Sequence, residues 1–228
     1  MNALALLKGL RFIDSFFPSG GYAFSSGLEA AVQAGQVSNA EEFALYVEDL
    51  MQGSISRREA VAVARAWDAQ ASGAGSEAKK TDLELDAMHL SREVRMASRQ
   101  MGRQVIRIAG DEPGSSPLLR DFYTMVENRL TPGHFPVCVG LTLGAAGWKR
   151  EDAVAAFLYQ TAVGFVSAGM KVLPLGQREG QRLLSLWASM IAEIAHTVTA
   201  EATLCAWSPV QDIFQMRHAR LESRLFRS

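Results

Sequence analysis

The stretch AVAAFLYQTAVGFVSAGM, residues 153–170, decides between two kinds of fold because it carries no formal charge. It is as long as a helix that crosses a lipid bilayer. However, Gln160, Thr161 and Ser167 interrupt its apolar character, it contains two glycines, and Lys171 follows at once. Polar groups at this density fit a helix packed against other helices better than a helix facing lipid. We therefore expect residues 153–170 to form a core helix of a protein outside the membrane.

Helical periodicity continues on both sides of this stretch. Ser116 followed by Pro117 is typical of a helix start, and an apolar stripe follows it. Residues 177–202 predict a long helix whose inward side chains are Leu183, Leu184, Trp187, Ile191, Ile194 and Ala195. No run alternates with period two for long enough to predict a strand. The sequence therefore predicts an all-α fold.

Two pairs of residues have the spacing of a capping box, in which a serine and a glutamate three residues later cap a helix start. These pairs are Ser38 with Glu41 and Ser26 with Glu29. Gly35 is placed to end the helix that Ser26 would begin. We expect helices to begin at both serines.

The helices are separated by short breaks rich in turn-forming residues. The breaks are SGAGSEAKKT (72–81), GDEPGSSP (110–117), TPGHFP (131–136) and AWSP (206–209). Because apolar periodicity resumes directly after each, we predict one domain over residues 1–228 with about ten helices and flexible termini. The basic tail, about residues 208–228, ends in Leu225 and Phe226, which we expect to be exposed. It could be a frayed end or a docking tail.

Composition excludes several classes of protein. The 23 Lys and Arg residues against 24 Asp and Glu leave a net charge of −1, which provides no overall attraction to nucleic acid or anionic membranes. Cys138 and Cys205 lie in apolar stretches far apart, which fits reduced thiols better than a disulfide framework. The N-terminal residues lack the pattern of an export signal. These features predict a cytoplasmic protein.

The loop FFPSGGYAFSSGLEAAV, residues 16–32, places a glycine turn before a helix. A phosphate cradle is a poor interpretation because no strand precedes the loop, no Gly-Lys-Ser/Thr is present and no basic side chain lies in it. Gly20 and Gly21 instead favour a tight turn with positive φ, which projects Tyr22 and Phe24 to one side. The two rings could belong to the core or anchor a partner.

Arginines recur every four residues at Arg95, Arg99, Arg103 and Arg107, with Arg92 beside them. On a helix they form one basic stripe of mutually repelling charges, so acidic groups should face it, either within the fold or on a partner. A nucleic-acid-binding helical protein that uses the Arg95–Arg107 stripe is the alternative function. The missing aromatic residues between the arginines argue against it.

Catalytic and metal-binding motifs are not found. The four histidines, His89, His134, His196 and His218, are scattered, without the spacing of a metal site, and each is expected to be structural. The serines near the glycine turn have no Gly-x-Ser-x-Gly context and no identifiable base. We expect no bound metal or cofactor and no enzymatic activity, although a helical enzyme assembled from distant residues stays open.

A sharp corner is predicted in GMKVLPLGQREGQRLL, residues 169–184. Pro174 and Gly176 should end one helix, and Gln177 should begin the next. Lys171, Gln177 and Gln181 crowd the corner with polar groups. Their amides could cap backbone groups, or the corner could contact a partner.

Five segments together make the sequence similar to the urease accessory protein UreF over nearly its whole length. They are PSGGYAFSSGLEAAVQAG, SREVRMASRQMG, GHFPVCVGLTLGAAG, MKVLPLGQREGQRLL and SRLFRS, in the family's order. The resemblance implies an all-α protein that forms a homodimer and docks onto UreD, also called UreH. That pair recruits the GTPase UreG, and the assembly delivers nickel to apo-urease in the cytoplasm, with nickel and GTP handled by the partners. It also raises regulation of UreG through an arginine supplied in trans.

Three motifs carry the partner-binding residues that the resemblance implies. The N-terminal motif holds Pro18, Gly20, Gly21, Ser25, Gly27, Leu28 and Glu29, to which the loop analysis adds Tyr22 and Phe24. The corner motif holds Lys171, Pro174, Gly176, Gln177 and Gln181, and the terminal motif holds Arg224, Leu225, Phe226 and Arg227. Phe24 stands where many relatives carry histidine, which argues against nickel handling by this loop. The tail HARLESRLF also departs from the common pattern of an acidic residue and an aromatic after the histidine.

Overall fold

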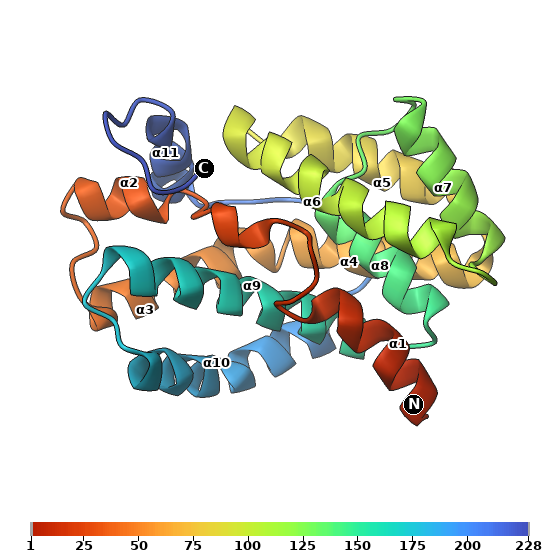
Figure 1. Cartoon of the computed structure of the whole chain (residues 1–228), viewed down its shortest axis with the longest axis horizontal. Helices are drawn as coiled ribbons and strands as arrows, with labels where there is room; N and C mark the ends of the chain where they lie inside the picture. Colours follow the sequence, from red (N-terminus) through yellow and green to blue (C-terminus); the bar gives the residue numbers. More distant parts are fainter. Residues whose placement is uncertain (1, 228) are drawn as a thin grey trace.

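The computed structural model describes residues 2–227, which form a single all-α domain without β-strands (Figure 1). The fold class is therefore as predicted, with eleven α-helices in this range instead of about ten. The helices are α1 (Ala3–Ile13), α2 (Leu28–Gln33), α3 (Ala40–Leu50), α4 (Glu59–Ser72), α5 (Gly75–Met88), α6 (Arg92–Asp111), α7 (Pro117–Glu127), α8 (Phe135–Ala145), α9 (Arg150–Val172), α10 (Gln177–Thr197) and α11 (Pro209–His218). A 3₁₀ turn, η1 (Gly21–Ala23), precedes α2, and a π-helical turn, η2 (Met51–Ile55), follows α3.

Helix α8 is the centre of the core, because its residues from Phe135 to Leu143 are all buried. It packs against α4, α6 and α9. Glycines allow the closest approaches: a Cβ atom at Gly140 would overlap the carbonyl oxygen of Val63 in α4. A Cβ atom at Gly102 of α6 would overlap the carbonyl oxygen of Gly133. The close packing therefore needs a glycine in α8 where it faces α4 and a glycine in α6 where it faces the turn before α8.

Helix α9 contains the apolar stretch that decides the fold. An 18-residue stretch of α9 has a mean hydropathy of 1.4, and its length and composition would allow it to cross a membrane. Half of this stretch is buried inside the fold, where α9 packs against α10, α4 and α8. Phe157, Leu158 and Phe165 are among its buried side chains. Its burial confirms the prediction of a packed core helix.

The helix predicted over residues 177–202 ends earlier, at Thr197. Its predicted inward residues are buried except Ile194, which is partly buried. The following segment runs extended past the start of α4, visible as the pale blue trace in Figure 1. Arg65 donates to the carbonyl oxygens of Ala200 and Ala202, and Cys205 N donates to Arg57 O. These tertiary hydrogen bonds replace those that a longer helix would make.

Local signals predicted helix ends with mixed success. Ser116 caps α7 with Pro117 as its first residue, as predicted. The expected box at Ser38 is displaced by one residue, because the side chain of Asn39 caps α3 while Glu42 accepts from the N–H of Ser38. Ser26 does not cap α2. The cap is Gly27, which has φ of 88° and no side chain, although Gly35 follows the helix with positive φ as expected.

Candidate partner-binding site

Segments from all three motifs meet at one end of the molecule, the end where Figure 1 shows α2, α11 and the C-terminus together. Helix α11 packs against α2 and α6. The residues after α11, 219–227, fold back over α2, and the tail means these residues from here on. The expectation that both Leu225 and Phe226 are exposed is half wrong. Leu225 is 72% exposed, but Phe226 is only 5% exposed. One side chain of the tail thus anchors it while the next faces solvent.

Glu29 of α2 is the group that holds the tail. It is 2% exposed, and its Oε1 accepts a hydrogen bond from the backbone N–H of Leu225 at 2.7 Å. Its Oε2 accepts from the N–H of Phe226 at 3.2 Å and lies 3.0 Å from Nε2 of His218. A buried carboxylate needs such donors to offset its lost hydration. Glu29 was predicted to face a partner, and its side chain instead binds this chain's own tail.

His218 extends this contact to α6. The imidazole is fully buried, and its Nδ1 lies 2.7 Å from Oε2 of Glu93. The other oxygen of Glu93 accepts from Arg224 at 2.9 Å. Helices α2, α6 and α11 and the tail are therefore linked through one buried ring. Sequence reasoning missed this role, because it weighed His218 alone and no local spacing joins it to Glu29 and Glu93.

Lys171, at the end of α9, brings the corner motif to the same place. Its ammonium group lies 5.0 Å from the centre of the Phe226 ring and 3.3 Å from the carbonyl oxygen of Tyr22. The N–H of Arg227 donates to the carbonyl oxygen of Ala23 at 2.8 Å. The terminal residues are thus fixed between the N-terminal loop and the end of α9, with a cation–π contact at their centre.

The N-terminal loop uses its glycines differently from the prediction. Gly20 has φ of 79°, as expected, but Gly21 lies in the 3₁₀ turn without positive φ. Gly27 has positive φ as well, and a Cβ atom there would lie 2.8 Å from the backbone nitrogen of Gln215 in α11. The turn leaves Tyr22 74% exposed, whereas Phe24 is partly buried. The loop therefore presents one aromatic ring to solvent and seats the helix that holds the tail.

The other predicted site residues divide by exposure. Ser25 is buried, and its hydroxyl accepts from the N–H of Glu29. The exposed residues are Pro18, Lys171, Pro174, Gln177, Gln181, Arg224 and Arg227. Gly176 caps α10 without a side chain, and the amides of Gln177 and Gln181 make no hydrogen bonds within residues 2–227. The capping interpretation of the corner amides is therefore not supported, and these amides face solvent.

The arginine stripe lies on one helix, α6, as predicted, and part of it is paired within the fold. Arg99 binds Asp86, and Arg103 lies 3.7 Å from Glu127. Arg95 donates to the carbonyl oxygen of His89, and Arg107 donates to the amide of Gln104. Only the first two contacts involve a carboxylate. Internal pairing therefore neutralises some of the stripe and leaves the rest to solvent.

His89 and His134 are buried, whereas the side chain of His196 is exposed. His134 is buried between Ser98 and Asp86, and burial lowers its pKa. Burial also lowers the pKa of His89 well below its usual value, with the charges of Arg58 and His134 acting in the same direction. Within residues 2–227, no three His, Cys, Asp or Glu side chains are grouped so that they could hold a metal ion.

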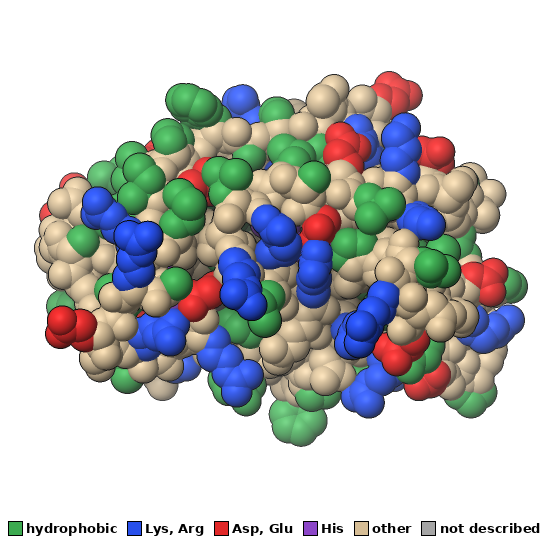
Figure 2. Space-filling model, turned by 90° about the horizontal axis from the view of Figure 1, so that it is seen from above, with side chains coloured by type: hydrophobic (Ala, Val, Ile, Leu, Met, Phe, Trp, Pro, Cys, Tyr) green, Lys and Arg blue, Asp and Glu red, His purple; other side chains and the backbone are tan. Residues whose placement is uncertain are grey.

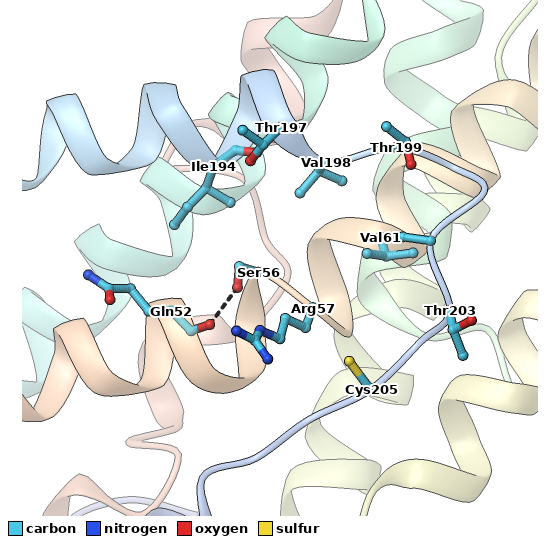
Figure 3. Close-up of a pocket in the computed structure, with 11 residues that line it drawn as sticks. Gln52, Ser56, Arg57, Val61, Ile194, Thr197, Val198, Thr199, Thr203 and Cys205 are labelled. Carbon is cyan, nitrogen blue, oxygen red and sulfur yellow. Dashed lines mark hydrogen bonds between the residues drawn. The ribbon is translucent and has the colours of Figure 1, made fainter.

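A small pocket of about 330 Å³ lies between α4, the end of α10 and the segment after it (Figure 3). Its lining includes the Cys205 thiol and the Ser56 hydroxyl, which donates to the carbonyl oxygen of Gln52 at 2.8 Å. Neither histidine nor carboxylate lines the pocket. The described residues therefore place no base beside these two nucleophile types.

Comparisons with known proteins show which family the chain is similar to. The UreF family model matches residues 37–188, which include the corner motif. The urease accessory protein UreF of Paenarthrobacter aurescens (strain TC1) is 30% identical to the chain over the full length of both sequences. The urease accessory protein UreF of Corynebacterium glutamicum (strain R) is 31% identical over 96% of both sequences. The same protein of Actinobacillus pleuropneumoniae serotype 3 (strain JL03) is 29% identical over 96% of this chain and 97% of its own length.

These relatives define the class, which is that of the urease accessory proteins. The chain belongs to the UreF family. As an accessory protein it serves urease maturation as a helper. The full-length relatives extend over the N-terminal and terminal motifs, which lie outside the matched family model.

Proposed function

We propose that this chain is a non-catalytic scaffold that, with UreD (UreH), recruits the GTPase UreG for GTP-dependent insertion of nickel into apo-urease. In this proposal it acts in the cytoplasm as a homodimer, binds no cofactor itself and leaves nickel and GTP to its partners. The observation that carries the proposal is the convergence of three motif segments at one end of the fold.

Tyr22 and Leu225, the fixed backbone that carries them and the start of α10 form a surface at this end that could bind a partner, and we call it the presentation surface. Buried Glu29 and Phe226 fix the tail, while Leu225 and Tyr22 remain more than two thirds exposed. A fixed backbone with exposed apolar side chains loses little conformational entropy when a partner binds. Large side chains of this kind carry much of the energy of protein interfaces. The start of α10, to which the exposed Gln177 and Gln181 belong, lies at the same end of the molecule (Figure 1).

Co-expression with UreD and UreG of the same organism tests the proposal, by affinity capture and size-exclusion chromatography with and without nickel and GTP. The double variant Tyr22→Ala, Leu225→Ala should weaken complex formation by about tenfold or more, because it removes the exposed anchors and adds no charge beside Glu29. Leu7→Ala is the matched control, since Leu7 is 64% exposed on α1, away from the tail. If the wild-type chain elutes alone under every condition, the proposal fails.

Regulation of UreG is a second part of the proposal. An arginine supplied in trans can stabilise the charge that develops during phosphoryl transfer. Arg227 suits this role better than Arg224, because Arg224 is engaged by Glu93 whereas the Arg227 side chain is exposed. The rate of GTP hydrolysis by UreG, measured with the wild type and with Arg227→Gln, tests this part. Equal rates with and without the chain would exclude it.

A further inference from the structure

A groove lies beside the arginine stripe of α6. Figure 2 shows Lys and Arg side chains in a band across the molecule when it is seen from above. The groove has a volume of about 1240 Å³. Residues from α5, α6, the end of α7 and the tail line it. Six of them are arginines, namely Arg92, Arg99, Arg103, Arg107, Arg129 and Arg227. Three are acidic, namely Asp86, Glu93 and Glu127.

The acidic side chains do not neutralise this surface. Asp86 is shared between Arg99 and His134, and Glu93 is engaged by His218 and Arg224. Glu127 reaches only Arg103, at 3.7 Å. Within residues 2–227, the side chains of Arg92, Arg107, Arg129 and Arg227 make no ion pair, and all four residues are exposed. The groove of a chain with net charge −1 thus carries a local excess of positive charge.

Arg129 occupies a position where glycine would be favoured. It follows α7 with φ of 59°, and its N–H donates to Val126 O while Leu130 N donates to Met125 O. This is the Schellman pattern, whose left-handed residue is usually glycine. An arginine there costs about 1 kcal/mol relative to glycine. Arg129 lines the groove, and backbone strain of this kind is often retained at functional sites.

The groove also contains exposed aliphatic side chains. Met96, Leu130 and Leu83 are 56%, 54% and 47% exposed and lie among its lining residues. Phe24 is the one aromatic side chain in the lining. A surface that binds single-stranded nucleic acid needs several aromatic platforms for the bases, whereas exposed aliphatic groups between arginines suit a peptide with alternating acidic and apolar residues. The lining therefore favours a protein ligand over nucleic acid.

We infer that this groove is a docking site for an acidic amphipathic segment of a protein partner in the urease maturation assembly. Asp and Glu side chains of the segment would pair with the free arginines, and its aliphatic side chains would cover Met96 and Leu130. Phe24 and Arg227 line the groove and also belong to the N-terminal and terminal motifs, so the groove is continuous with the proposed presentation surface. The identity of the partner rests on the proposed function.

Two measurements on the complex with UreD and UreG test the inference. First, a photo-reactive benzoylphenylalanine replaces Met96, and the cross-linked peptide is identified by mass spectrometry. Leu186 is the matched control position, because it is equally exposed at 56% and lies on α10 outside the groove. We expect position 96 to cross-link to a partner segment with an excess of Asp and Glu, and position 186 not to cross-link to that segment.

Second, the charge of the groove is reversed with Arg103→Glu, Arg107→Glu. Binding to immobilised partners should weaken at least tenfold and lose much of its salt dependence. Arg103→Gln, Arg107→Gln should give an intermediate loss. The control Lys8→Glu, Lys80→Glu makes the same change in net charge outside the groove and should leave affinity within twofold. Circular dichroism and thermal melting establish that each variant is folded.

The outcomes separate the two proposals. If the wild-type complex forms but position 96 cross-links to nothing, to a second copy of this chain or to nucleic acid, the groove inference is wrong and the scaffold proposal stands. Equal loss of affinity in the groove variant and in the lysine control also overturns the groove inference. If the wild-type chain binds neither partner, both proposals fall together.

Discussion

Glu29→Gln should release the C-terminal tail while leaving the rest of the fold intact. The amide is close in shape to the carboxylate, but it offers one acceptor oxygen where two are used. In the wild type, the N–H of Leu225 donates to Oε1 of Glu29 at 2.7 Å. If the single oxygen of the glutamine keeps the contacts that Oε2 makes with Phe226 N and the imidazole of His218, its NH₂ group faces the N–H of Leu225. One charge-assisted hydrogen bond is lost and a donor is left unpaired.

The cost follows from these contacts. Losing one bond to a charged acceptor is worth about 2 to 3 kcal/mol. This corresponds to a roughly 30- to 150-fold larger population of the open tail. Because tail opening is a local event, the melting temperature of the helical core should change much less.

Hydrogen–deuterium exchange of the C-terminal peptide measures this population directly. The amides of Leu225 and Phe226 should exchange faster in the variant by about that factor, since local exchange reports the open fraction. Glu222→Gln is the matched control, because Glu222 is exposed on the same tail and makes no hydrogen bond within the described residues. Unchanged exchange in Glu29→Gln, or an equal rise in Glu222→Gln, would refute the assignment of Glu29 as the residue that holds the tail.

Three further predictions concern the stability of the fold. Gly102→Ala should lower stability by about 1 to 3 kcal/mol, because its Cβ atom would overlap Gly133 O, and a thermal melt should detect this while Gly75→Ala, which has open space, stays near the wild type. Burial opposes ionisation of Asp86, yet hydrogen bonds from Arg99 and His134 lower its pKa. The ionised Asp86 therefore stabilises the fold above about pH 4, and this stabilisation is lost as pH falls. In urea denaturation, Asp86→Asn should reduce the loss of unfolding free energy that the wild type shows at acid pH. Burial, together with the charges of Arg58 and His134, lowers the pKa of His89, so the unfolded chain binds a proton there first and the free energy of unfolding should fall as pH drops below about 6.5. His89→Gln should reduce that slope and leave the part that buried His134 contributes, and an unchanged slope would contradict the assignment.

The sequence predicted what local interactions determine. The start of α7 depends on the hydroxyl of Ser116 and the ring of Pro117, which are neighbours in the chain, and the structure has both as expected. The end of α10 depends instead on Arg65, which binds carbonyl groups more than one hundred residues further along the chain. Helical periodicity could not reveal that competition, so the predicted helix was too long. The same limit applies to Ser26, because α2 begins after Gly27, where a Cβ atom would lie 2.8 Å from the backbone nitrogen of Gln215 in α11.

The candidate site shows this limit most clearly. Glu29, His218 and Leu225 lie at opposite ends of the sequence, and Glu93 lies far from all three. The resemblance to UreF named two of them as motif residues, but it could not state that one motif binds another. A buried glutamate and an exposed glutamate look the same in a sequence. Only the fold shows that the terminal motif is held by the N-terminal one.

The tail therefore shapes two surfaces at once. Glu29 and Lys171 hold the terminal residues so that Leu225 faces solvent, and the same hold places Arg227 in the lining of the arginine groove. Opening the tail would remove an exposed anchor from one surface and a positive charge from the other. A partner that touched both surfaces would bind the closed tail more tightly than the open one, and by linkage its binding would hold the tail closed. In that arrangement, the buried Glu29 contributes to partner affinity without touching the partner, because it sets the population of the closed tail.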